Sequence, residues 1–375
     1  MKDLKRICIV SEHYPTNEEP LFPFVQQLAY SLSKENVECI IIAPQSITRC
    51  IIRHKKMQKR DSIDITPDGY KIRVLRPYTI TFSDKFFHKL ANFFLRRAIK
   101  NGLKKVNNVD CIYSYFWHIG LTVARTFKKT STPLFVQASE CEITVKDFML
   151  KEAYLNRISG VVCASGKNQK ESLDMHLVKK EDTTIIVNGY RSDEFYPCDK
   201  LEVRKKLNIS KDKFVVAFVG GFIERKGIKQ LCTAIDRFDD VYSIFIGQGA
   251  IKPNCKNILF QGLVRHNEIV KYLNTADVFV LPTNAEGCCN AIIEALACGL
   301  PVISSNKTFN DEILDDMCSI RINEDSVDEI YNSIKKIKEN AILKKNMSTA
   351  ALKKSEQLTI EHRAKSIKEF IESRI

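Results

Sequence analysis

The chain has 375 residues and a formal net charge of +13, and 44% of its residues are hydrophobic while 27% are charged. This length is more than one typical hydrophobic core needs, so we expect two domains. No apolar run is long enough to span a bilayer, and the N-terminus enters a strand pattern without the apolar core of a signal peptide. We therefore expect neither kind of segment, and we expect a cytoplasmic protein.

The thirteen cysteines are scattered along the chain, with no Cys-x-x-Cys pair and no histidine at metal-ligand spacing. This pattern is typical of small buried hydrophobic residues in a reducing compartment. It predicts neither a disulfide framework nor a zinc site.

The excess of positive charge predicts an anionic partner or an anionic surrounding. Nucleic acid, acidic lipid and nucleotide phosphates all satisfy this requirement, and a solvated lysine-rich surface accounts for part of the charge by itself. Composition leaves the partner open, so the positions of the basic residues must decide.

The N-terminal residues predict a β-α-β unit with a long first loop. Arg6–Val10 and residues 38–43 are apolar runs typical of strands, and the helical spacing of Phe24, Leu28 and Leu32 predicts a helix between them. Loops that follow parallel strands lie at the edge of the sheet where ligands bind, so we expect a ligand pocket in the first loop.

Two basic segments follow this unit. Residues 46–66 are polar and basic without a clear periodicity, which predicts a surface loop. Residues 83–105 place aromatic and basic side chains at helical spacing. That helix either docks on an anionic membrane surface, where apolar burial and charge attraction add, or packs as an ordinary amphipathic helix on its own sheet.

Three further strands continue the pattern, at residues 111–115, 134–137 and 160–164. Each is followed by a loop or helix pattern, which is typical of a doubly wound parallel sheet. A strand, the turn at Asn188 and Gly189, and Pro197 then close the first half, so we expect a domain boundary nearby.

The second half opens with Phe214–Val219, a buried strand that Gly220 and Gly221 turn. A helix is expected after Lys226. Glycines let a ligand approach the backbone closely, and a cation at such a turn can neutralise a diphosphate, so these residues are candidates for donor binding. The alternative is that Arg225 and Lys226 are an ordinary pair of surface cations.

The segment 277–303 carries most of the chemistry. Val278–Leu281 predicts a buried strand, and a polar loop leads from it to a helix at 290–298. Glu286 lies in the loop and Glu294 in the helix. Carboxylates accept hydrogen bonds from sugar and ribose hydroxyls, while amides at a helix start favour phosphate. These amides belong to Gly287, Cys288, Cys289 and Asn290. The segment thus fits the parts of a sugar nucleotide, and a pair of solvated surface acids is the alternative.

The seven-residue gap between Glu286 and Glu294, the sequence EALACGLPVI that follows and the glycine turn before Lys226 resemble the retaining glycosyltransferase family 4 of the GT-B fold. The resemblance is strong over 214–303 and weaker in the N-terminal half. It implies an α/β architecture of two Rossmann-like, doubly wound parallel-sheet domains facing a central cleft. The implied parts are an N-terminal acceptor-binding domain (1–195), a C-terminal nucleotide-sugar-binding domain (196–355) and a last helix (356–375) that crosses back to the first domain.

The resemblance implies transfer of a sugar from a nucleoside-diphosphate sugar to a hydroxyl of a glycan or lipid-linked glycan. The anomeric configuration would be retained, and the product would be a surface polysaccharide such as capsule, O-antigen or teichuronic acid. No general base is identifiable, which suits a front-face mechanism in which the leaving phosphate itself accepts the acceptor proton.

The same resemblance assigns the donor-binding residues. Glu286 would hold the sugar and Glu294 the ribose, while Lys226, Arg225 and the amides at 287–290 would stabilise the departing diphosphate. The base would lie against Gly262, Leu263 and Val264. For Leu263 and Val264 a core position is the alternative.

The chain departs from the family in its N-terminal half. Many relatives carry a His-Gly-x-Asp signature whose histidine lies close to the transferred sugar, whereas this chain has Gln137, Ala138, Ser139 and Glu140 there. Glu140 and His118 are therefore catalytic candidates only by proximity, and a structural role for His118 is the alternative. Pro23 stands where relatives usually place a glycine.

We expect no metal and no cofactor besides the donor substrate. No two aspartates are separated by a single residue, so the charge of the diphosphate is assigned to protein groups and not to magnesium or manganese.

The sequence is also compatible with other functions. A catalytically weak or inert sugar-nucleotide-binding partner of a polysaccharide assembly system is the main alternative, because the signature histidine and the loop glycine are missing. A different GT-B activity, such as that of an epimerase or a phosphorylase, is a further one. Nucleic-acid binding follows from charge alone and is not expected. Docking of residues 83–105 would make the protein peripheral on the inner face of the plasma membrane.

Overall fold

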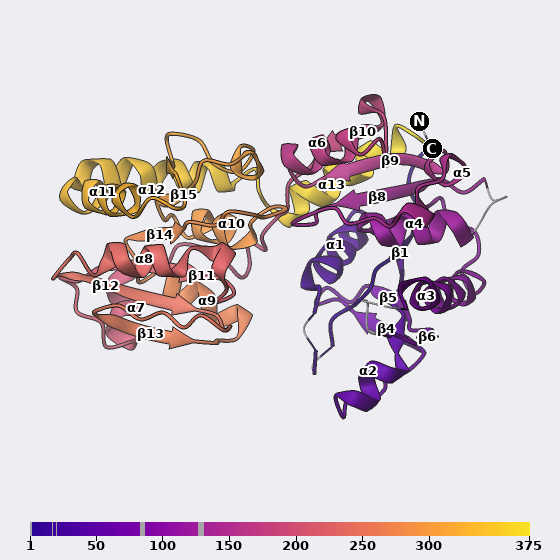
Figure 1. Ribbon diagram of the computed structural model, residues 1–375, viewed down its shortest axis with the longest axis horizontal. Helices are drawn as coiled ribbons and strands as arrows, with labels where there is room; N and C mark the ends of the chain where they lie inside the picture. The colour runs from indigo at the N-terminus through magenta and orange to yellow at the C-terminus, as the bar shows by residue number, and fades with distance from the viewer. Residues whose placement is uncertain (1, 17, 20, 83–86, 127–130) are drawn as a thin grey trace. The chain divides into compact units, whose positions relative to one another are not determined.

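The structure is a computed structural model that describes residues 2–16, 18–19, 21–82, 87–126 and 131–375. The chain divides into two compact units: Val187–His362, and a first unit that combines Met1–Ile186 with Arg363–Ile375. Each unit is a mainly parallel sheet covered by helices (Figure 1), which confirms the predicted α/β class. The chain leaves the first unit after Ile186, earlier than the boundary expected at 195.

In the first unit the strand order is β10-β9-β8-β7-β1-β2-β5-β4. The described pairs are parallel except for the antiparallel pair of β4 and β5. The strands are β1 (Arg6–Val10), β2 (Glu38–Ile42), β4 (Asp61–Ile65), β5 (Lys71–Leu75), β7 (Cys111–Tyr115), β8 (Leu134–Ala138), β9 (Ile158–Cys163) and β10 (Thr183–Ile185). Helices α1 (Pro23–Lys34), α4 (Trp117–Thr126), α5 (Glu152–Leu155) and α6 (Gly166–Asp174) accompany them, and β3 (Gln45–Ser46) pairs with β6 (Tyr78–Thr79).

In the second unit the order is β13-β12-β11-β14-β15-β16, with parallel pairs throughout the described sheet. The strands are β11 (Phe214–Val219), β12 (Val241–Ile246), β13 (Ile258–Gly262), β14 (Val278–Leu281), β15 (Val302–Ser305) and β16 (Ser319–Ile322). The helices are α7 (Lys200–Lys206), α8 (Ile228–Ile235), α9 (His266–Leu273), α10 (Asn290–Ala297), α11 (Val327–Glu339) and α12 (Ala341–Ser355).

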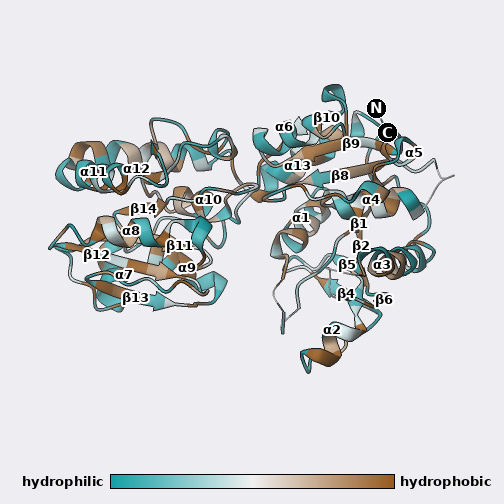
Figure 2. Cartoon of the chain, viewed as in Figure 1, coloured by the Kyte–Doolittle hydropathy of each residue, from teal (hydrophilic) through white to brown (hydrophobic). Residues whose placement is uncertain are grey.

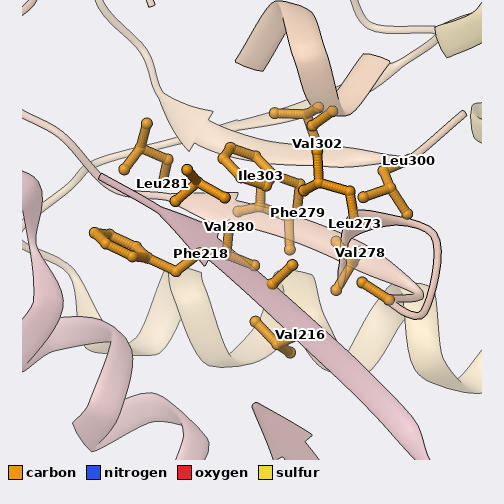
Figure 3. Close-up of a cluster of buried hydrophobic side chains, with 14 of the residues drawn as sticks. Val216, Phe218, Leu273, Val278, Phe279, Val280, Leu281, Leu300, Val302 and Ile303 are labelled. Atoms are coloured by element: carbon orange, nitrogen blue, oxygen red, sulfur yellow. The ribbon is translucent and has the colours of Figure 1, made fainter. Parts of the chain in front are cut away.

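The central strands of both sheets are buried on both faces, which is why they read as continuous apolar runs. In Figure 2 the brown of the hydrophobic residues is plain along β8 and β9, while the helices show both colours. Figure 3 shows Val216 and Phe218 of β11 packed beside the side chains of β14 and Val302 of β15. This packing holds the strands rigidly, so that the loops at their carboxyl ends are well positioned.

Each sheet has one place where the strand order reverses. In the first unit it lies between β7 and β1, and in the second between β11 and β14. Open α/β sheets bind ligands outside the carboxyl ends of the strands at such points. The loops after β1, β7, β11 and β14 are therefore the expected ligand loops.

The last helix, α13 (Ile360–Glu372), returns the chain to the first unit. Ala364, Ile367 and Ile371 are buried in the core that includes β1 and β2. The Arg363 guanidinium donates to the carbonyl oxygen of Ile186 and to the side-chain oxygen of Gln137, each at 2.8 Å. These contacts explain the apolar stripe of the C-terminal residues.

The prediction of a loop at 46–66 is wrong, because this segment contains helix α2 (Ile47–Ile52) and strand β4. The Ser46 side chain caps α2 by accepting a hydrogen bond from the Arg49 amide. In β4 the usual alternation is inverted. Ile63 is 54% and Ile65 is 60% exposed, while the Asp64 carboxylate accepts the hydroxyl of Tyr14 at 2.5 Å. Ile63, Asp64 and Ile65 alternate as in a strand, but this alternation is short and lies in a polar, basic segment.

Helix α3 (His88–Leu103) lies within the basic aromatic segment, and residues 83–86 of that prediction lie outside the described residues. Its second half packs on the sheet, with Ala98, Ile99 and Leu103 buried. Its first turns expose Leu90 and Phe93 instead. No helix in the described part of the chain combines the length and apolar character that a membrane span requires.

Candidate functional site

The loops after β11 and β14 meet around the carboxylate of Glu286. Lys226 donates to it through Nζ, Arg225 Nη1 lies 3.1 Å from Oε1, and the Thr283 hydroxyl donates at 2.9 Å. Glu286 is 8% and Lys226 9% exposed. The alternative of a solvated loop acid is therefore wrong, and three of the residues predicted for the donor site lie together at the strand switch point.

A close backbone contact holds the two loops in register. Gly227 has a φ of 67°, and a Cβ atom there would lie 2.2 Å from the carbonyl oxygen of Pro282. The Arg225 carbonyl oxygen accepts the Asn284 amide at 2.9 Å and lies 3.1 Å from the Thr283 hydroxyl oxygen. Only glycine fits at position 227, and this fit places Lys226 opposite Glu286.

The start of α10 faces the same loops. No side chain caps this helix among the described residues, so its first amides keep the anion preference of a helix N-terminus. The Cys289 side chain is buried in the core, and burial raises the pKa of its thiol to about 12. Asn290 accepts a hydrogen bond from the Asn188 side chain at 2.8 Å. The buried Cys289 thiol therefore stays protonated, and the role of the loop cysteines as backbone donors stays a prediction.

Glu294 lies inside α10 and is 8% exposed, so it is not a helix-surface acid. Its Oε1 lies 3.2 Å from Nε2 of His266, and Nδ1 of the same ring lies 3.3 Å from the carboxylate of Glu194. Burial raises the pKa of the Glu294 carboxyl, while the hydrogen bond from His266 opposes this effect. The sequence did not single out His266, because its partners come from distant positions.

The remaining predicted donor residues lie at the carboxyl ends of β11 and β13. Gly220 and Gly221 follow β11 directly, and a Cβ at Gly247 would lie 1.9 Å from the Gly220 carbonyl oxygen. The turns after β11 and β12 therefore pack backbone against backbone. Gly262 ends β13, and Leu263 after it is 61% exposed. A core position for Leu263 is wrong, whereas Val264 packs against the core.

In the first unit, His118 is paired with a residue that the sequence did not indicate. His118 Nε2 lies 2.7 Å from the carboxylate of Glu12, the second residue after β1. Burial lowers the pKa of His118, but the contact with Glu12 outweighs it and leaves the pKa raised. The pKa of Glu12 is lowered, because the contacts with His118 outweigh the effect of burial. This ion pair lies at the switch point between β7 and β1.

Glu140 has a different surrounding. Its carboxylate accepts the backbone amides of Trp117 at 2.6 Å and Ser139 at 2.8 Å, at the start of α4. Burial raises the pKa of this carboxyl, and the two amides oppose the rise. Glu140 therefore satisfies a helix start, much as an N-cap residue does.

Two phenylalanines beside the Glu12–His118 pair have left-handed backbones, which is uncommon outside glycine. Phe22 has a φ of 58° and Phe116 a φ of 73°. Their rings meet edge to face with centroids 5.6 Å apart, and the Phe116 ring stacks on His118 at 6.3 Å. Pro23, expected at the family's glycine position, is the first residue of α1, and Phe22 before it carries the left-handed conformation.

Known proteins resemble this chain in sequence and in fold. The family model "Glycosyl transferases group 1" matches residues 199–354. The chain is 25% identical over 319 residues to TuaC of Bacillus subtilis (strain 168), which is named as a teichuronic acid biosynthesis glycosyltransferase; the match covers 80% of this chain and 81% of TuaC.

Solved structures share the fold over nearly the whole chain. Sucrose-phosphate synthase of Thermosynechococcus elongatus superposes with a TM-score of 0.78 at 16% identity, covering 98% of both chains. HepE of Anabaena in complex with UDP gives a TM-score of 0.72 at 15% identity, covering 98% of this chain and all of that chain (100%). The chain thus has the GT-B fold, and its residues 199–354 match the model of the group 1 glycosyltransferase domain.

Proposed function

We propose that the protein is a retaining glycosyltransferase of surface polysaccharide biosynthesis. It moves a sugar from a nucleoside-diphosphate sugar to a hydroxyl of a glycan or lipid-linked glycan. The buried contact of Glu286 with Lys226 and Arg225, next to the uncapped start of α10, is the observation that carries the proposal. A relative named for teichuronic acid biosynthesis and a structural neighbour that binds UDP support the substrate class.

The donor site works by placing fixed charges where the diphosphate leaves. Lys226, Arg225 and the amides at 287–290 stabilise the negative charge that develops when the bond between the anomeric carbon and the phosphate oxygen breaks. Glu286 then accepts hydrogen bonds from sugar hydroxyls, and Glu294 accepts them from the ribose. Because the donor brings two phosphates, it replaces Glu286 as the main anionic partner of Lys226. The base lies along residues 262–264.

The acceptor oxygen attacks the anomeric carbon from the face that the phosphate leaves. Its proton passes to the departing phosphate oxygen, so no protein base and no metal are required. The absence of an Asp-x-Asp motif from the sequence supports this metal-independent chemistry.

The acceptor binds at the switch point of the first unit. Here the Glu12–His118 pair offers polar groups to hydroxyls, and the rings of Phe22 and Phe116 offer an apolar face. Strained backbone at two aromatic residues is typical of ligand sites. Glu140 accepts a hydrogen bond at the start of α4, and it contributes by positioning this helix.

The exposed part of α3 serves a lipid-linked acceptor by resting on the anionic inner surface of the plasma membrane. Phe87, Leu90 and Phe93 are exposed, and Lys89 and Arg97 are exposed nearby on the same helix. Apolar burial and attraction to acidic lipid add in such a helix. Co-sedimentation with vesicles of acidic phospholipid should fall on Phe93→Ser, and it should be absent with neutral phosphatidylcholine.

The test of the function begins with the donor. A thermal-shift screen with the diphosphates of uridine, guanosine and adenosine and with their sugars identifies the ligand, because binding to the folded state raises the melting temperature. Slow release of nucleoside diphosphate from the sugar nucleotide supports a transferase. Binding without turnover on any acceptor supports the inert partner instead, and no binding at all excludes both.

A further inference from the structure

His266 is held between two carboxylates of the second unit. Its Nε2 lies 3.2 Å from Glu294 Oε1, and its Nδ1 lies 3.3 Å from Glu194 Oε2. The ring also meets the edge of Phe195, with centroids 5.2 Å apart and an interplanar angle of 79°. Three contacts therefore define the position and the tilt of this imidazole.

The two contacts specify the charge of the ring. A neutral imidazole carries a single N–H and can donate to one carboxylate only, whereas the imidazolium cation donates to both. The hydrogen bonds to Glu194 and Glu294 accordingly raise the pKa of His266 to about 10. At neutral pH the group is a cation that bridges two anions.

The bridge connects parts of the second unit that are far apart in the sequence. Glu194 lies in the segment that follows Ile186, where the chain enters the unit, and Arg191 Nη1 pairs with Glu194 Oε1 at 2.7 Å. His266 is the first residue of α9, directly after the loop at residues 262–264. One line of charge contacts therefore runs from Arg191 and Glu194 in the entry segment through His266 to Glu294.

We propose that His266 is a positioning residue for the nucleotide, which holds the Glu294 carboxylate in the orientation that binds the ribose hydroxyls. The inference rests on the proposed function, because it assigns the ribose to Glu294. A carboxylate has two oxygens and about four acceptor sites, so one hydrogen bond from His266 leaves acceptor capacity for a diol. Without the imidazolium, a carboxyl as buried as that of Glu294 gains a proton more easily and is free to rotate.

The competing interpretation is that His266 only stabilises the fold through a buried ion pair. The two roles differ in what they do to ligand selectivity. A purely structural residue changes the affinity for all nucleotides alike or not at all. A residue that orients the Glu294 carboxylate lowers the affinity only for nucleotides whose ribose hydroxyls bind that carboxylate.

The experiment compares two ligands by titration calorimetry: the nucleoside diphosphate among UDP, GDP and ADP that binds the wild type most tightly, and its 2′,3′-dideoxy analogue. We expect His266→Gln to lower the affinity for the nucleoside diphosphate about tenfold, as for loss of a charge-assisted hydrogen bond. The affinity for the dideoxy analogue should fall less than about twofold. Glu194→Gln should also lower the affinity for the diphosphate more than the affinity for the dideoxy analogue, by a smaller factor. Lys271→Gln, which removes one exposed positive charge from the same helix, should leave both affinities unchanged.

A double variant tests the coupling itself. If His266 acts through Glu294, the double variant His266→Gln with Glu294→Gln should bind the diphosphate with the same affinity as Glu294→Gln alone. Equal weakening of both ligands by His266→Gln, or additive losses in the double variant, overturns the inference. These results are distinct from failure of the proposed function, in which the wild type binds no nucleoside diphosphate. A wild type that binds both ligands equally refutes the ribose assignment while leaving donor binding intact.

Discussion

The ammonium group of Lys226 donates to the carboxylate of Glu286 across two loops that follow neighbouring strands of one parallel sheet. Both side chains are buried, and Arg225 and Thr283 contribute further contacts to the same carboxylate. A cation held in place by an acid is ready to meet a diphosphate, because the charge is already oriented and partly desolvated.

Lys226→Met should abolish most of the activity. We expect kcat to fall about 100- to 1000-fold, the typical loss when one preorganised electrostatic donor is removed. The variant also leaves Glu286 with Arg225 as its remaining cation, so the melting temperature should drop. Adding Glu286→Gln to Lys226→Met should recover stability without activity. The exposed Lys229→Met is the matched control, and a comparable loss in Lys229→Met would contradict the assignment.

Gly227→Ala should disrupt the site through its backbone. The left-handed conformation costs alanine about 1–2 kcal/mol, and the contact with Pro282 adds overpacking of about 1–3 kcal/mol. Gly69→Ala has a similar φ of 86° but no atom within 4 Å of the added Cβ, so it should show the first cost alone. Chemical denaturation measures both. Equal losses at the two positions would refute the role of the loop contact.

Glu140→Gln should affect stability and not chemistry. The glutamine side chain has one oxygen, so its NH₂ group faces one of the two backbone N–H groups that the Glu140 carboxylate accepts. Two hydrogen-bond donors then oppose each other, which costs about 1–3 kcal/mol. The expected kcat per folded molecule stays within about threefold of the wild type, with Glu142→Gln on the exposed neighbour as control. A loss of about 100-fold in kcat with unchanged stability would instead support Glu140 as a catalytic group.

The stability of the second unit should depend on the charge of His266. Its pKa is raised from 6.5 to about 10 on folding, so the ion pairs with Glu194 and Glu294 stabilise the fold fully below about pH 6.5. This contribution declines as the pH rises and is lost above about pH 10, where the ring is neutral. The melting temperature of wild type should therefore exceed that of His266→Gln by more at about pH 6 than at about pH 10.5. A difference that does not change with pH would show that His266 carries no charge in the folded protein.

Local sequence carried enough information for the parallel strands and for the loops at their ends. The runs at Phe214–Val219 and Val278–Leu281 are apolar throughout because both faces of those strands are buried. Glycine positions and the spacing of Glu286 and Glu294 are local features of single loops, so they could be recognised before the fold was known. Strand β4 was not predicted, because its alternation of Ile63, Asp64 and Ile65 is short and lies in a polar, basic segment.

What the sequence by itself determined is the class of the fold, the family resemblance and most of the residues now found around Glu286. Only the tertiary structure decided which side chains meet: His266 with Glu294, Glu12 with His118, and Glu140 with the start of α4. The physical reason is that strand and helix periodicity depends on neighbours along the chain. Ion pairs between loops of different strands depend on the strand order instead, and no local pattern encodes that order.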